Sequence, residues 1–151
     1  MARRYRPVKR RTPEFDESVA LCEYLQTMYP ERWPLIFHVP NERSNKVEAA
    51  RMKATGVKAG VPDYVFPFAR LSFHGLYLEF KPTGATVSDV RETQHAFCER
   101  LQREGYAAIA ALGIDAAIAV IDAYMLGERE KWDQLVPQGS VIVSRASKGG
   151  V

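Results

Sequence analysis

Cysteine is scarce in this sequence, and long apolar runs are missing from it. The 151 residues include two cysteines, Cys22 and Cys98, each among apolar residues in a helical pattern, so we expect free thiols rather than a disulfide or a metal site. No apolar run reaches the roughly 18–20 residues of a membrane-spanning helix, and no apolar segment follows the basic N-terminus as in a secretory signal. These absences argue against a membrane protein and favour a reducing, cytoplasmic setting.

Acidic residues are absent from the first 11 positions, where basic residues are concentrated. Six basic residues lie there: Arg3, Arg4, Arg6, Lys9, Arg10 and Arg11. The net charge of the chain is +3, and without these six groups 15 basic residues face 18 acidic ones. We expect residues 1–13 and 146–151 to be disordered tails. A basic tail either binds the phosphates of nucleic acid or is simply solvated, and composition leaves both interpretations open.

Two short runs of aromatic and branched residues in the middle of the chain predict a β-hairpin. Tyr64–Phe66 and Leu76–Phe80 favour strands buried on at least one face, and a probable turn separates them. Side chains alternate along a strand, so Glu79 and Lys81 share a face. If the strands pair, Asp63 at the start of one lies beside Glu79 at the end of the other.

Two carboxylates and an ammonium group would then meet at one end of the sheet. Neighbouring carboxylates repel each other unless a cation lies between them, and carboxylate oxygens suit Mg²⁺ or Mn²⁺. Lys81 would be placed to hold or activate a water molecule and to offset charge on a phosphate. The alternative is a surface hairpin with an ordinary Glu–Lys pair, because acid-x-Lys is common in strands.

The order of these residues resembles a known nuclease motif. Pro62-Asp63 followed by Glu79-Phe80-Lys81 is similar to the PD-(D/E)XK motif, and the string from Gly56 to Asp63 resembles the VRR-NUC family of small phage and bacterial nucleases. The segment from His38 to Glu42 and the later Gln94 also resemble that family. The similarity extends over roughly residues 14–112.

The resemblance implies roles for several residues. Asp63, Glu79 and the Phe80 carbonyl would bind the metal, and Lys81 would act on the attacking water, leaving a 5′-phosphate. Many similar nucleases add an acid from the first helix; Glu17 is our choice, with Glu14 close behind, although first-turn acids also complement the helix dipole.

Three further residues are expected to contact the substrate or the site. The resemblance places Gln94 beside the catalytic lysine, where it would orient water or phosphate, and Asn41 near the active site. A surface glutamine and a turn residue after Pro40 are the alternatives. Lys58, in the loop before Asp63, is the basic residue best placed to reach a scissile phosphate.

The remaining pattern predicts an α/β fold in which helices flank a central mixed β-sheet. The resemblance makes this fold restriction-endonuclease-like, and we expect one nuclease domain over residues 14–145. Helices are predicted over 14–28, 45–55, 88–104 and 116–126, with further strands over 35–39 and 106–112. Residues 141–143 form either an extra edge strand or a strand that pairs with a second subunit.

Together these features predict a Mg²⁺- or Mn²⁺-dependent DNA endonuclease, and beside the nuclease motif we expect the six basic residues of the N-terminal tail to bind DNA. The resemblance to small family members implies a homodimer in a bacterial or phage-infected cell that cuts branched DNA such as Holliday junctions, since two symmetric sites suit a symmetric junction. A monomeric flap or nicking nuclease and a non-catalytic DNA-binding accessory protein are the alternatives.

Overall fold

The computed structural model of this chain describes residues 12–40 and 45–144. Five strands form one mixed sheet in chain order: β1 (Phe37–His38), β2 (Tyr64–Phe66), β3 (Leu76–Lys81), β4 (Ala107–Leu112) and β5 (Ile142–Ser144). The pairs β1–β2 and β2–β3 are antiparallel, whereas β3–β4 and β4–β5 are parallel. The predicted α/β fold with a central mixed sheet is therefore confirmed.

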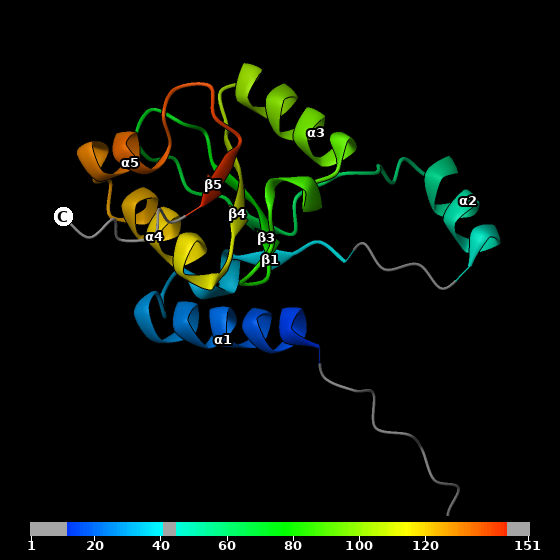
Figure 1. Ribbon diagram of the computed structural model, residues 1–151, viewed down its shortest axis with the longest axis horizontal. Coiled ribbons are helices and arrows are strands. Elements are labelled where there is room, and N and C mark those ends of the chain that lie inside the picture. The colour runs from blue at the N-terminus through cyan, green and yellow to red at the C-terminus, as the bar shows by residue number, and fades with distance from the viewer. Residues whose placement is uncertain (1–11, 41–44, 145–151) are drawn as a thin grey trace, which may run out of the picture.

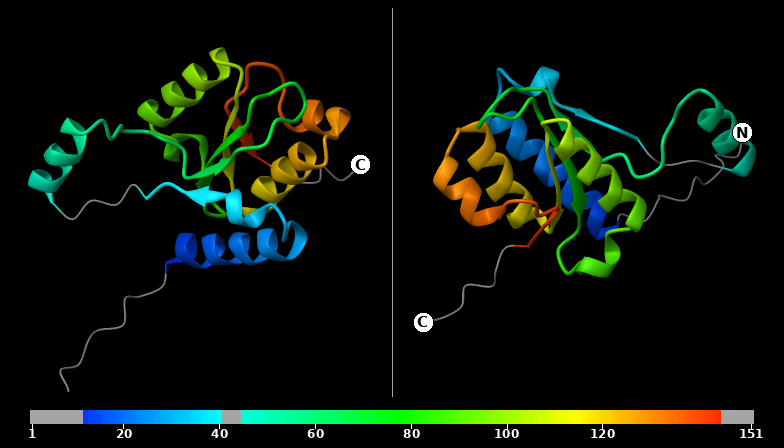
Figure 2. Two further views of the ribbon diagram at one scale, coloured as in Figure 1. Left: turned by 180° about the vertical axis from the view of Figure 1, so that it is seen from behind. Right: turned by 90° about the horizontal axis from the view of Figure 1, so that it is seen from above.

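Helices cover both faces of this sheet (Figures 1 and 2). The α-helices are α1 (Pro13–Met28), α2 (Lys46–Ala54), α3 (Glu92–Arg103), α4 (Ile114–Met125) and α5 (Arg129–Leu135). Helices α1, α4 and α5 pack with Leu76, Leu78 and Phe80 in the larger core. On the other face, Cys98 of α3 packs on Ala108 and Ala110. Glu79 and Lys81 alternate with the residues of the larger core and therefore belong to the α3 face.

The first helix begins as its sequence predicts. The Thr12 hydroxyl accepts a hydrogen bond from the Phe15 backbone N–H at 3.2 Å, and Pro13 occupies the first helical position. Leu21 and Leu25 are fully buried, whereas Val19 and Met28 are exposed. Helix α1 is also tied to α4, because the Asp122 carboxylate accepts hydrogen bonds from the Tyr24 and Tyr29 hydroxyls.

Several predicted boundaries are wrong for local reasons. The strand expected over 35–39 is shorter, because Trp33–Leu35 forms a 3₁₀ turn around Pro34, whose ring fixes φ. The helix expected from Ser88 begins at Glu92: Val87–Asp89 is a separate 3₁₀ turn, closed by the Asp89 carboxylate on the Thr86 N–H at 2.7 Å. Helix α5 was not predicted; its buried residue is Trp132.

Two other expectations are confirmed. Both cysteines are free thiols, with Cys98 fully buried. The C-terminal segment forms an edge strand, β5, which pairs with β4 of the same chain. No helix in the described part of the chain is long and apolar enough to cross a membrane. The tails predicted for residues 1–13 and 146–151 lie largely outside the described residues.

Candidate active site

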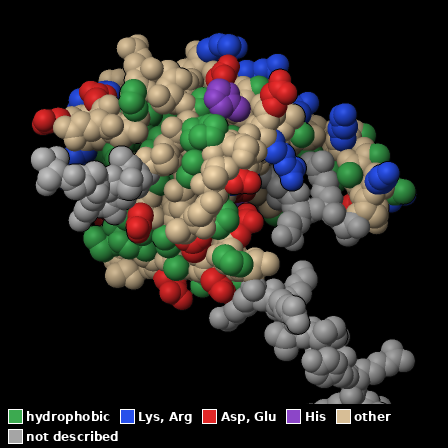
Figure 3. Space-filling model, in the orientation of Figure 1, with side chains coloured by type: hydrophobic (Ala, Val, Ile, Leu, Met, Phe, Trp, Pro, Cys, Tyr) green, Lys and Arg blue, Asp and Glu red, His purple; other side chains and the backbone are tan. Residues whose placement is uncertain are grey.

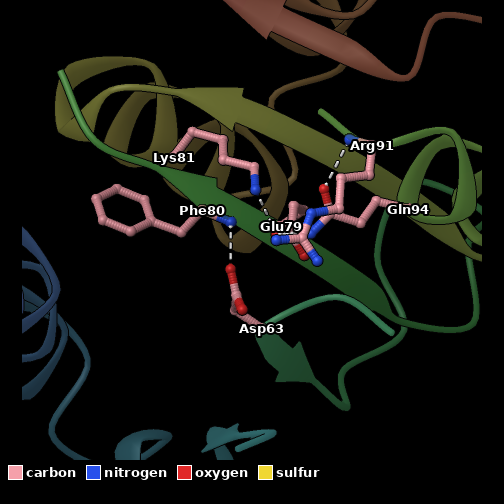
Figure 4. Close-up of polar contacts among 6 residues, drawn as sticks. All are labelled: Asp63, Glu79, Phe80, Lys81, Arg91 and Gln94. Atoms are coloured by element: carbon pink, nitrogen blue, oxygen red, sulfur yellow. Dashed lines mark hydrogen bonds and ion pairs between the residues drawn. The ribbon is translucent and has the colours of Figure 1, made fainter. Parts of the chain in front are cut away.

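The β2–β3 hairpin brings Asp63 and Glu79 together. Tyr64 pairs with Leu78 in antiparallel register, so the preceding Asp63 lies beside the following Glu79. The Asp63 carboxylate is fixed by the backbone, because its Oδ2 accepts a hydrogen bond from the Phe80 N–H at 2.8 Å (Figure 4). The hairpin and the juxtaposition of carboxylates predicted from the sequence are therefore present.

Glu79 is the centre of the polar contacts at this end of the sheet. It is 2% exposed. Its Oε1 lies 3.2 Å from Lys81 Nζ and accepts a hydrogen bond from Gln94 Nε2 at 2.8 Å. Figure 4 shows Lys81 and Gln94 converging on this carboxylate from β3 and α3. The second oxygen, Oε2, is buried and has no hydrogen-bond partner among the described residues.

Burial makes the negative charge of this pair costly. Desolvation, together with the charge of Asp63, raises the pKa of Glu79 to about 8, and Lys81 offsets only part of this rise. Burial also raises the pKa of Asp63, although its hydrogen bond from the Phe80 N–H and the nearby Lys81 ammonium oppose this rise. The positive charge of Lys81 is therefore too small to balance both carboxylates when both are ionised.

A hard divalent cation would supply that charge. Asp63 and Glu79 provide carboxylate oxygens of the kind that Mg²⁺ and Mn²⁺ prefer, and Glu79 Oε2 is a buried acceptor without a partner in the described chain. The described residues contain no group of three or more His, Cys, Asp or Glu side chains arranged around a metal position. A metal here would therefore complete its shell with backbone carbonyls, water or phosphate oxygens.

Gln94 orients the buried carboxylate. It lies in the first turn of α3, where its Oε1 accepts a hydrogen bond from the Arg91 backbone N–H at 2.9 Å while its Nε2 donates to Glu79. The Gln94 amide thus caps helix α3 and also fixes the Glu79 carboxylate. Gln94 and Lys81 both contact Oε1 of Glu79, so Gln94 lies next to the lysine, which is the position that the resemblance implies.

If Glu79 binds a metal in a DNA nuclease, as the sequence predicts, Gln94→Ala is expected to reduce DNA cleavage about ten- to hundredfold, because loss of a group that orients a metal ligand typically has an effect of this size. The measurement is the initial cleavage rate at several Mg²⁺ concentrations. The exposed Gln134 of α5 offers the matched control, Gln134→Ala, which should cut at the wild-type rate. If Gln94→Ala cut DNA at the wild-type rate and with the wild-type dependence on Mg²⁺, Gln94 would not have this orienting role.

Gly60 packs the loop before Asp63 against the same helix. Its φ is +82°, and a Cβ atom built on it would lie 2.4 Å from the Thr93 carbonyl oxygen, so only glycine fits. Gly60 belongs to the string that resembles the VRR-NUC family, and no role was predicted for it. A glycine two residues before Pro-Asp is the available signal that two backbones approach closely here.

The two acids of the first helix have different surroundings. Both carboxylate oxygens of Glu17 are engaged by Thr83, in the loop after β3, through its backbone N–H at 2.6 Å and its hydroxyl. Glu14 is exposed, and its charge contributes to the raised pKa of Asp63. Glu17 thus touches the loop that follows Lys81, and its predicted metal role remains a prediction alongside that of Glu14.

The other predicted residues are placed less directly. The Phe80 side chain is buried in the larger core and its backbone N–H holds Asp63; metal binding by its carbonyl stays a prediction. Lys58 is exposed in the loop before Asp63. Asn41 and the six basic residues of the N-terminal segment lie outside the described residues.

A large cavity lies away from these residues. Its volume is about 830 Å³, and it is lined by residues of α3, α5 and the start of β4, including Tyr106, Trp132 and Arg129. None of the residues that line it is Asp63, Glu79, Lys81 or Gln94. The polar contacts that define the candidate active site are therefore at the sheet end rather than in this cavity.

Comparison with known proteins supports the same interpretation. No protein-family model matches the sequence, and no curated protein matches it. A solved structure described as "VRR_NUC domain protein" is similar, with 31% sequence identity, coverage of 78% of this chain and 92% of that chain, and a TM-score of 0.67. The mixed five-stranded sheet and flanking helices are those of a PD-(D/E)XK-type nuclease domain. The chain belongs to the VRR-NUC family.

Proposed function

We propose that this protein is a Mg²⁺- or Mn²⁺-dependent endonuclease that hydrolyses phosphodiester bonds in branched DNA as a homodimer. The observation that carries the proposal is the meeting of Asp63, Glu79 and Lys81 at one sheet end, with a buried oxygen of Glu79 that has no partner among the described residues. Membership of the VRR-NUC family supports nuclease chemistry.

The residues at the sheet end have distinct roles in this reaction. Asp63 and Glu79 would hold the metal, which when bound supplies positive charge to the phosphate and lowers the pKa of a coordinated water. The Phe80 N–H fixes one carboxylate, and Gln94 fixes the other. The Lys81 ammonium donates to Glu79. In the proposed reaction it would orient the attacking water and stabilise charge that develops on the phosphate.

Symmetric cutting is the reason for proposing both a branched DNA substrate and a homodimer. Two active sites related by a two-fold axis cut two strands of a four-way junction in one complex. A small domain has little other means of recognising a junction. Both points are proposals that cleavage and mass measurements test together.

Cleavage of a panel of end-labelled DNAs tests the proposal: a four-way junction, a flap, single strands and linear duplex, each with Mg²⁺, Mn²⁺ or EDTA. We expect paired symmetric cuts in the junction, lost with EDTA and in Lys81→Ala. The control Lys131→Ala removes an exposed lysine of α5 and should cut normally.

The other outcomes have defined meanings. Cutting of flaps by a protein that light scattering shows to be monomeric would keep the nuclease and replace its substrate and assembly. DNA binding without cleavage under either metal would support a non-catalytic accessory protein.

A further inference from the structure

Helix α2 does not pack into the core. None of its nine residues, all of them described, is buried, and Val47 is 66% exposed. Each of the other α-helices described buries at least one side chain. Figures 1 and 2 show α2 standing apart from the sheet and from the helices that cover it.

A helix of this length is not stable by itself in water. Isolated helices shorter than roughly 12–15 residues are marginal even with favourable sequences. Local features help α2: Asn45 Oδ1 accepts a hydrogen bond from the Glu48 N–H at 2.8 Å, and Arg51 and Lys53 complement the dipole in the last turn. Such features contribute little compared with packing, so a bound partner is the natural source of further stability.

The charge of this region indicates the kind of partner. Residues 45–60 contain four basic residues (Lys46, Arg51, Lys53 and Lys58) and one acidic residue, a net charge of +3 in a short segment. All four basic residues are exposed. Figure 3 shows Lys and Arg side chains on the outside of the projecting helix. A cluster of exposed cations that outnumbers the acidic residues four to one favours a polyanion.

The apolar residues of α2 do not make a protein-binding face. Val47 and Met52 are five positions apart and lie on different sides of the helix, and the remaining apolar residues are alanines. The helix has no aromatic residue to act as an anchor in a protein interface. These features favour DNA over a second copy of the chain.

The region is also attached to the candidate active site at both ends. On the incoming side, the Val39 N–H donates to the Asp63 carbonyl at 2.6 Å. On the outgoing side, Gly60 packs on the backbone of Thr93 and Gln94. The segment thus projects from the point where the metal-binding carboxylates are expected.

We propose that residues 45–60 form a DNA-binding arm in which Lys46, Arg51 and Lys53 contact backbone phosphates of the duplex next to the bond that is cut. This inference rests on the proposed function, because it assigns a contact to the same substrate. Phosphate contacts of this kind position the duplex without reading its sequence.

The test compares two triple variants of the full chain that lose the same charge. The arm variant is Lys46→Gln, Arg51→Gln and Lys53→Gln, because glutamine keeps helix propensity. The control variant is Arg100→Gln, Arg103→Gln and Lys131→Gln, on α3 and α5. Fluorescence anisotropy in EDTA measures binding to labelled junction and duplex at several salt concentrations, and light scattering measures the mass of each variant.

We expect the arm variant to bind on the order of tenfold more weakly, or worse. Its plot of log affinity against log salt concentration should be shallower, with the magnitude of the slope reduced by roughly 2–3, because each phosphate contact contributes about 0.9. The control variant should bind like wild type. An equal loss in both variants, or no loss in the arm variant, overturns the proposal. A changed mass of the arm variant with DNA affinity equal to that of the control identifies a second copy of the chain as the partner instead.

The outcome is separable from that of the proposed function. If the wild-type protein cuts DNA and the arm variant binds DNA normally, only the proposed DNA-binding arm is contradicted. If the wild-type protein binds DNA through the arm but never cuts it, only the proposed nuclease activity is contradicted.

Discussion

Replacing Glu79 with glutamine is expected to reduce DNA cleavage at least about a thousandfold while the protein stays folded. The substitution keeps the shape of the side chain and removes one of the two negative charges that would hold the metal. Lys81 then also loses its anionic partner, which lies 3.2 Å away in the wild-type protein. The measurement is single-turnover cleavage with Mg²⁺ and with Mn²⁺.

Stability measurements separate this catalytic effect from unfolding. In EDTA the wild-type protein buries the Glu79 carboxyl group, and only one of its oxygens is paired within the described part of the chain, so Glu79→Gln should unfold at the same temperature or a higher one. Glu104→Gln, at the exposed C-terminal end of α3, is the matched control and should cut normally. Cleavage at the wild-type rate by a folded Glu79→Gln protein would contradict metal binding by this residue.

The metal-free protein is expected to lose stability as the pH rises from about 4.5 to about 8. The pKa of Glu79 is about 8 in the folded protein and 4.5 without the effects of folding. Between these values the folded state holds a proton that the unfolded state has released, so each increase in pH favours unfolding. Below 4.5 both states are protonated and the penalty is absent. The raised pKa of Asp63 acts in the same direction.

Added Mg²⁺ should oppose this loss, because a bound cation stabilises the ionised carboxylates. The expected difference near pH 8 is on the order of a few kcal/mol in the free energy of unfolding. Thermal unfolding from pH 5 to pH 9, with EDTA or with Mg²⁺, measures it, and Mg²⁺ titration at pH 7 should release protons. Glu79→Gln is the control and should show a much weaker pH dependence. Identical pH profiles for the two proteins would exclude Glu79 as the source.

The parts of the site that lie on neighbouring strands could be predicted from the sequence. Strand alternation placed Glu79 and Lys81 on one face, and the probable turn between the two apolar runs placed Asp63 beside Glu79. These are local regularities, because each depends on residues fewer than 20 positions apart. The start of α1 has an equally local cause, because Thr12 caps the helix and Pro13 occupies its first position.

Contacts between distant elements could not be predicted in this way. Thr83 binds Glu17 across 66 positions, and nothing in either local sequence indicates that pairing. The hydrogen bond from Gln94 to Glu79 depends on how α3 packs on the sheet, although the resemblance to VRR-NUC proteins indicated that this glutamine belongs near the site. The isolation of α2 is also a tertiary property: its sequence predicts a helix and does not show that nothing covers it.

Side-chain competition explains the errors in the elements. Ser88 looked like a helix cap, but Asp89 accepts the Thr86 N–H and closes a separate turn first. The helix then starts at Glu92, with the Gln94 side chain on the Arg91 N–H. The helix starts here because Gln94, at the third helical position, accepts a hydrogen bond from the N-cap backbone of Arg91, as in a capping box.

The hydrogen bond from the Val39 N–H to the Asp63 carbonyl closes the base of the projecting segment, residues 45–60, so the segment can be replaced without changing the sheet. The chain leaves the sheet and returns to it at almost the same point, so the length of what lies between does not determine the pairing of β1 with β2. Lengthening a loop whose ends are already fixed has a small entropic cost. If residues 45–60 bind DNA as proposed, exchange of residues 45–58 for a segment of another length or charge, with Gly60 and Asp63 retained, should therefore change the affinity for DNA without altering the residues at the sheet end.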